Sequence, residues 1–217
     1  MWLVFGISGT LICAGSAMLW RYLSRRRRSH RAGHGLHTCL QLLGTLQAVP
    51  NEMISRELRK CLVLMLHRHI INLQATSPEH PHIDHLMKRL GQLNRLPSGM
   101  STTTMRSKSD RQAALAGFEQ LIEIIDQAVA HRDLDSKMAQ LGRAAARFAY
   151  QQLAVDIARK AALDAEHVRA YPQALGLVYQ AHGLTRQMPP QLGRSLADAI
   201  KQDIERLERM VGKPLAN

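Results

Sequence analysis

Histidine is the residue type in this chain with the most potential for site chemistry. The chain has 11 histidines, and His80, His82 and His85 stand beside Asp84 where a helix is predicted to begin. Imidazole nitrogens and a carboxylate oxygen form a donor set that suits Zn²⁺ or a similar ion. The preceding predicted helix ends near two more histidines, His67 and His69. The candidate metal ligands are therefore His80, His82, Asp84 and His85, and exposed histidines without a metal are the simpler interpretation.

Other catalytic patterns are missing from the sequence. It contains no G-x-x-x-x-G-K-[ST] or G-x-G-x-x-G phosphate loop, no H-E-x-x-H, no C-x-x-C and no G-x-S-x-G. Acidic pairs such as Glu119 with Glu123, or Asp133 with Asp135, fall on the predicted solvent side of helices. We therefore predict no catalytic residue and no cofactor, and we do not expect an enzyme.

Positive charge is concentrated near the N-terminus. The formal net charge is +12, and six arginines lie between residues 21 and 31, whereas no acidic residue precedes Glu52. Residues 109–217 carry 14 basic and 13 acidic side chains, so they are nearly neutral. Binding of DNA or RNA needs a basic surface on the folded body. A membrane-tethered nucleic-acid binder is therefore only the third interpretation.

An uncharged apolar segment precedes the arginines. Residues 2–20 read WLVFGISGTLICAGSAMLW, and as a helix they would span roughly 28 Å, close to the thickness of a bilayer core. Aromatic rings at both ends and a basic block after the span are typical of a transmembrane helix. The predicted membrane-interface residues are Trp2, Trp20, Arg21, Tyr22, Arg25, Arg26, Arg27, Arg28 and Arg31. We expect the arginines to contact anionic lipid headgroups.

The position of the basic block predicts the orientation of this span. All of the basic residues follow it, which favours an outside N-terminus and a cytoplasmic C-terminal body. A cleavable signal peptide is the main alternative, but only Met1 precedes the apolar run, so the basic leading region is missing. This arrangement is typical of a single-pass protein of a bacterial inner membrane.

Small residues recur on one face of the predicted span. Gly9, Cys13 and Ala17 are four residues apart, and such spacing lets two membrane helices approach closely. These three residues are the candidate helix–helix contact in the membrane.

The rest of the chain shows a helical period almost everywhere, which predicts an all-α body of about seven helices in a bundle, divided into two lobes. Apolar seams recur, for example through Leu115, Phe118, Ile122, Ile125 and Val129, and no segment alternates as a strand does. The predicted domains are a transmembrane helix over 2–20, a basic juxtamembrane segment over 21–34, a first helical lobe over 35–96, a Ser/Thr-rich linker over 97–109 and a second helical lobe over 110–217.

These features together predict a single-pass inner-membrane protein with a cytoplasmic helical module for protein interaction or scaffolding. Helical bodies with exposed seams often bury them on another chain, so we expect a protein partner or a homo-oligomer. The alternative is a membrane-anchored enzyme or a metal-dependent sensor that uses the histidine cluster.

Overall fold

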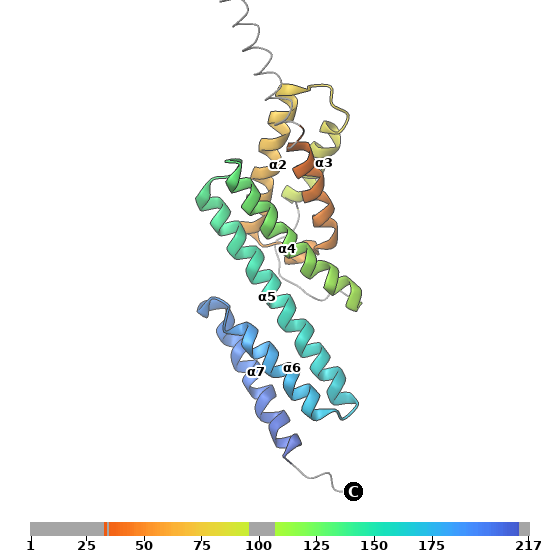
Figure 1. Ribbon diagram of the computed structural model, residues 1–217, viewed down its shortest axis with the longest axis vertical. Helices are drawn as coiled ribbons and strands as arrows, with labels where there is room; N and C mark the ends of the chain where they lie inside the picture. Colours follow the sequence, from red (N-terminus) through yellow and green to blue (C-terminus); the bar gives the residue numbers. More distant parts are fainter. Residues whose placement is uncertain (1–32, 34, 96–106, 213–217) are drawn as a thin grey trace, which may run out of the picture.

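The computed structural model describes residue 33 and residues 35–95 and 107–212, which form helices and turns without any strand (Figure 1). The predicted all-α class is therefore confirmed for this part of the chain. The expected transmembrane helix over 2–20, with Gly9, Cys13 and Ala17, lies outside the described residues, as do the interface residues up to Arg31. Within the described ranges, no helix combines the length and the apolar character needed to cross a bilayer.

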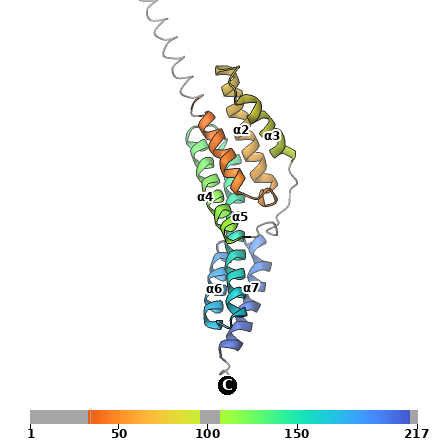
Figure 2. The ribbon, with the colours of Figure 1, turned by 90° about the vertical axis from the view of Figure 1, so that its right-hand side faces the viewer.

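Helices of very different length follow one another along the chain. The first covers residues 35–48. It is followed by the 3-10 helix η1 (Asn51–Met53), α2 (Arg56–Thr76), α3 (Ile83–Arg95), α4 (Lys108–Ala130), α5 (Ser136–His167), α6 (Tyr171–Thr185) and α7 (Pro190–Val211). The long helix α5 runs through most of the molecule, and the other helices pack around its two halves (Figures 1 and 2).

The buried apolar side chains form two separate clusters that meet within α5. The first extends from Cys39 to Leu153 and the second from Val155 to Leu207. We call the helix over 35–48, α2, α3, α4 and the first half of α5 the N-terminal bundle. The second half of α5 with α6 and α7 is the C-terminal bundle. The first cluster contains residues from both sides of the predicted linker over 97–109, so the hydrophobic core is not divided there.

The two clusters differ in their side chains. Large aliphatic and aromatic residues fill the N-terminal bundle, including Phe118, Leu62 and Ile124, which are fully buried. Alanine supplies much of the C-terminal core, at Ala158, Ala162, Ala165, Ala174 and Ala181. Helices with alanine at the contact pack closely but bury less apolar area per residue.

Small residues also decide which face of α5 is buried in the N-terminal bundle. The sequence predicts a seam through Met138, Leu141 and Ala145, but Leu141 is 47% exposed. The buried positions are instead Ala139, Gly142, Ala146 and Ala149. A Cβ on Gly142 would lie 2.5 Å from Cys61 Sγ, which is too close for a real contact. Only a residue without a side chain lets α2 approach α5 this closely.

Local side-chain hydrogen bonds set several helix starts. Ser107 and Asp110 form a reciprocal capping box at α4, and Asp135 accepts from the backbone N–H groups of Lys137 and Met138 at α5. Asn51, a favourable N-cap residue type, predicts that α2 begins at about residue 52. Ser55 caps it instead, by accepting from the Leu58 N–H at 3.2 Å. Residues 51–53 form η1 rather than the first turn of the longer helix.

Candidate functional site

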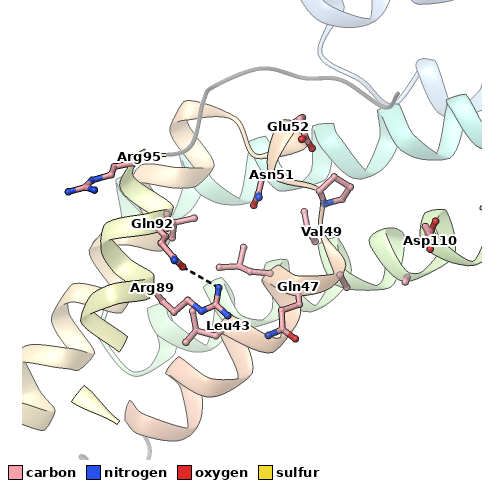
Figure 3. Close-up of a pocket in the computed structure, with 14 residues that line it drawn as sticks. Leu43, Gln47, Val49, Asn51, Glu52, Arg89, Gln92, Arg95 and Asp110 are labelled. Carbon is pink, nitrogen blue, oxygen red and sulfur yellow. Dashed lines mark hydrogen bonds between the residues drawn. The ribbon is translucent and has the colours of Figure 1, made fainter. Parts of the chain in front are cut away.

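An open groove lies on the N-terminal bundle between α3, the first turn of α4 and the chain that leaves the helix over 35–48 (Figure 3). Its volume is about 920 Å³, at the upper end of the range for binding pockets in proteins. The lining residues are Leu43, Leu46, Gln47, Ala48, Val49, Pro50, Asn51, Glu52, Arg89, Gln92, Leu93, Arg95, Asp110 and Ala113.

Packing of the residue 35–48 helix against α4 creates one side of this groove. A Cβ on Gly117 would lie 2.7 Å from Val49 Cγ2, so the glycine makes room for the Val49 side chain. Thr45 Oγ1 donates to Gln120 Oε1 at 3.1 Å and ties the same two helices together. Pro50 has no N–H to continue the helix, and the chain turns away into η1.

The opposite wall belongs to α3, which packs on α2 through Ile83, Leu86 and Leu93. Because α3 leans on α2, a gap remains between α3 and the turn at Pro50. Leu43 and Leu46 are partly exposed at the floor of this gap. The groove therefore offers apolar surface to a ligand without any rearrangement of the core.

Charged side chains surround the apolar floor. Arg89 and Arg95 project from the α3 wall, and Arg89 Nη1 donates to Gln92 Oε1 at 3.2 Å. Glu52 and Asp110 lie on the far side (Figure 3). The Asp110 carboxylate is already engaged, since Oδ2 accepts from the Ser107 N–H at 3.1 Å. Arg89 and Arg95 therefore carry the positive charge of the rim, and Glu52 carries a negative charge on the side opposite to them.

The lining of the groove is mostly apolar, with a few charged and amide side chains. The described lining residues include no histidine, cysteine, serine or threonine. The titratable side chains among them are Glu52, Asp110, Arg89 and Arg95.

The structure separates the residues of the predicted metal site. His80 and His82 are neighbours, with ring centroids 5.4 Å apart, and the His82 N–H donates to His80 Nδ1 at 3.3 Å. Asp84 and His85 are exposed on the first turn of α3. His69 is buried beside Gly35. In residues 35–95 and 107–212, no three His, Cys, Asp or Glu side chains converge to hold a metal ion. The candidate ligands His80, His82, Asp84 and His85 therefore stay a prediction from the sequence.

Both cysteines of the described chain are buried thiols in the N-terminal bundle. Burial raises the pKa of Cys39 to about 12 and that of Cys61 to about 11. The thiolate is the nucleophilic form of cysteine. At neutral pH these side chains are therefore packing residues, with Cys61 fitted against Gly142.

The acidic pairs noted in the sequence have structural partners. Glu123 Oε1 accepts from Gln127 Nε2 at 3.3 Å, and Asp135 caps α5. Burial, with a hydrogen bond to Glu119, raises the pKa of Tyr150.

Sequence reasoning missed the groove altogether. Its residues come from three separate segments without a shared motif, and only the break at Pro50 gave a local signal. No protein-family model matches the chain, and neither a curated protein nor a solved structure is significantly similar to it.

Proposed function

We propose that the chain is a single-pass inner-membrane protein whose cytoplasmic helical body docks a segment of a partner protein in the groove. The observation that carries this proposal is the groove itself, which presents Leu43 and Leu46 between two charged walls. A groove of this kind accepts the apolar face of an amphipathic helix.

The charges of the rim specify the chemistry of the partner. Arg89 and Arg95 are exposed on the α3 wall, and their guanidinium groups favour carboxylates. The partner segment that fits has apolar side chains on one face and acidic side chains on the edge that lies against α3. Electrostatic complementarity of this sort contributes mostly to specificity and to the rate of association.

The membrane anchor is supported by the sequence of residues 2–20 and by the arginines that follow. Alkaline carbonate extraction of membranes tests it directly. The full chain stays in the membrane pellet, whereas a chain that lacks residues 2–20 is released. Release of the full chain contradicts the anchor.

Photo-crosslinking tests the groove in the intact protein. A photoreactive amino acid at Gln47, an exposed lining position, yields one discrete product with a partner protein in membranes. Ala113→Arg places a long charged side chain in the groove and abolishes this product. Ala116→Arg is the matched control, because Ala116 is exposed on the same helix but does not line the groove.

Three outcomes contradict docking of a partner segment in the groove. The first is a product of equal yield in both arginine variants, and the second is the lack of any product. The third is a product made only of two copies of this chain, which would identify the groove as a self-association surface.

A further inference from the structure

One charged side chain of the groove is held in place by a neighbour on its own helix. Arg89 and Gln92 are three residues apart on α3, and Arg89 Nη1 donates to Gln92 Oε1 at 3.2 Å. Figure 3 shows the Arg89 side chain reaching from α3 towards the floor of the groove near Leu43. A side chain that is already oriented loses less conformational freedom when it binds a ligand.

Arg89 has no carboxylate partner in the part of the chain that the structure describes. None of the ion pairs found there includes an arginine of α3. The two carboxylates of the groove lining, Glu52 and Asp110, lie on the opposite side (Figure 3). A guanidinium has five N–H donors, and the bond to Gln92 uses one of them. Arg89 can therefore bind a carboxylate of a ligand with two parallel hydrogen bonds.

The second arginine of the α3 wall is placed differently. Arg95 is the last residue of α3 and lies about 9 Å along the helix axis from Arg89. Figure 3 shows its side chain pointing away from the floor of the groove. Both arginines are exposed and carry the same charge. Arg95 is therefore a matched comparison for the position of Arg89.

The apolar floor continues beyond the groove along the helix over 35–48. Leu36, Leu40 and Leu43 are spaced by four and three residues, so they lie on one face of this helix. Leu43 lines the groove, Leu40 is 42% exposed, and Leu36 is partly exposed. From Leu36 to Gln47, another lining residue, this face extends about 16 Å, which is the length of three turns of an α-helix.

The extended floor and the oriented arginine together describe a helical ligand. A helix that lies on this face covers Leu40 and Leu43 with its apolar side. Arg89 stands at the edge of the same floor, beside Leu43 (Figure 3). Residues three or four apart lie on the same side of a helix. The ligand side chain that reaches Arg89 therefore comes from a position within one turn of the residue that covers Leu43.

We infer that Arg89 is the specificity-determining residue of the groove and binds an aspartate or glutamate of a three-turn amphipathic helix of the partner protein. This inference rests on the proposed function, because it assumes that the groove docks a partner segment. It adds the sequence pattern of that segment, a carboxylate within one turn of the apolar residues that cover Leu40 and Leu43. Glu52 repels a carboxylate on the opposite side, so the acidic residues follow one edge only.

Binding of synthetic helical peptides to the full chain in nanodiscs tests the role of Arg89. The probe is a fluorescein-labelled peptide of about 14 residues with leucine along one face and glutamate along one edge. The matched peptide has glutamine in place of each glutamate, and empty discs of the same neutral lipid give the background. Fluorescence anisotropy should show that the glutamate peptide binds at least about tenfold more tightly than the glutamine peptide.

Three single variants assign this preference to Arg89. Arg89→Gln should lower the affinity for the glutamate peptide to that for the glutamine peptide. Arg95→Gln removes the same charge from the same helix and should change the affinity by less than about threefold. Gln92→Glu gives Arg89 a carboxylate of its own, three residues away on α3, and should abolish the preference although the arginine is still present.

A charge reversal separates direct pairing from damage to the fold. Arg89→Glu should abolish binding of the glutamate peptide, because two carboxylates then face each other. The same variant should bind a peptide with lysine in place of each glutamate, which the unchanged chain binds only weakly. Recovery of binding with the lysine peptide requires that the groove of the variant is folded.

The outcomes distinguish failure of this inference from failure of groove docking. Equal affinity for the glutamate and glutamine peptides, or an unchanged preference in Arg89→Gln, refutes the role of Arg89. Binding that Ala113→Arg leaves unchanged lies outside the groove and also refutes it. A lack of binding by both peptides refutes the inferred ligand, whereas the crosslink at Gln47 still tests whether the groove docks a partner protein.

Discussion

The two bundles share α5 but are stabilised differently. The N-terminal bundle buries large side chains such as Phe118, whereas the C-terminal bundle has an alanine-rich core. Ion pairs, in contrast, are more numerous in the C-terminal bundle. Only Arg143–Asp126 is found in the described part of the N-terminal bundle, while Arg159, Asp203, Arg206 and Glu166 form a connected network between α5 and α7.

This difference accounts for the surfaces that each bundle offers. A core of large side chains holds its helices in place and can leave a gap, and the groove lies at such a gap. In the C-terminal bundle, the three helices pack closely through small side chains, so little space remains between them. The groove belongs to the N-terminal bundle, so we expect binding there and a mainly structural role for the C-terminal bundle.

Truncation of a matched isoleucine in each core tests whether the bundles are independent. Ile125 and Ile200 are both fully buried, one in each cluster. Replacement of either by Ala removes apolar contacts and leaves a cavity, at a cost of about 2–5 kcal/mol. We expect Ile125→Ala to speed hydrogen exchange mainly in α2 and α4, and Ile200→Ala to speed it mainly in α6 and α7. Equal acceleration everywhere in both variants would show a single cooperative unit.

Alkaline pH should weaken the N-terminal bundle through its thiols. Burial raises the pKa of Cys39 to about 12 and that of Cys61 to about 11 from 9.0. The folded state favours the neutral thiol, so this stabilisation is complete below about pH 9 and is lost as the pH rises towards the folded values. At a pH of about 10.5, the loss is on the order of 4 kcal/mol for the two thiols together.

Urea unfolding at about pH 8 and about pH 10.5 measures this loss. The double variant Cys39→Ala/Cys61→Ala should show a much smaller decrease in the free energy of unfolding between the two pH values. Tyrosine ionisation contributes equally to both proteins and cancels in the comparison. An identical decrease in the double variant would mean that the thiols do not carry the alkaline sensitivity.

Replacement of a glycine by alanine should have opposite effects on stability in the two bundles. A Cβ on Gly142 would overlap Cys61, with distances of 2.5 Å to Sγ and 2.7 Å to Cβ, so α2 and α5 must separate. We expect Gly142→Ala to cost about 1–3 kcal/mol. Gly176 in α6 has open space around it, and Gly176→Ala should stabilise by about 0.5–1 kcal/mol through helix propensity. Thermal unfolding measures both effects. If Gly142→Ala left the stability unchanged, α2 and α5 would be loosely packed where they cross.

The helical class of the body could be predicted from sequence because the period of large apolar residues is a direct signal. The same signal is only partly right on α5, where the predicted Leu153 is buried but Leu141 is exposed. The buried residues between them include Gly142 and Ala146, which the periodicity did not select. Hydrophobic periodicity gives weight to large side chains, whereas the closest helix contacts select small ones.

The turns show where local rules compete. The pair Ser77-Pro78 predicts a helix start there, with Ser77 as the cap, but α3 begins at Ile83 after two turns that include Pro81. Tyr171-Pro172 predicts a break in the long helix, and this is confirmed, because α5 ends at His167 and α6 begins at Tyr171 with Pro172 in its first turn. The candidate site could not be predicted from the sequence, because the groove depends on how α3 is placed relative to the turn at Pro50.

Of the changes considered, loss of an ion pair should give the smallest difference in stability between the two bundles. Asp203 contacts Arg159 at 2.8 Å and Arg206 at 3.5 Å, and Arg206 also pairs with Glu166, which raises the pKa of the arginine. In the N-terminal bundle, Asp126 contacts only Arg143, at 2.7 Å, and both side chains are partly exposed. Exposed pairs contribute about 0.2–1 kcal/mol each, and networks contribute more reliably than isolated pairs.

Asp203→Asn should therefore destabilise the chain more than the matched variant Asp126→Asn. We expect a loss of about 1 kcal/mol for Asp203→Asn and less than about 0.5 kcal/mol for Asp126→Asn at low salt. In about 1 M salt the Debye length falls to about 3 Å, so both losses should shrink and the difference should largely disappear. If Asp126→Asn were the more damaging change, α7 would be held to α5 by its apolar contacts through Ile200, Ile204 and Leu207 rather than by charge.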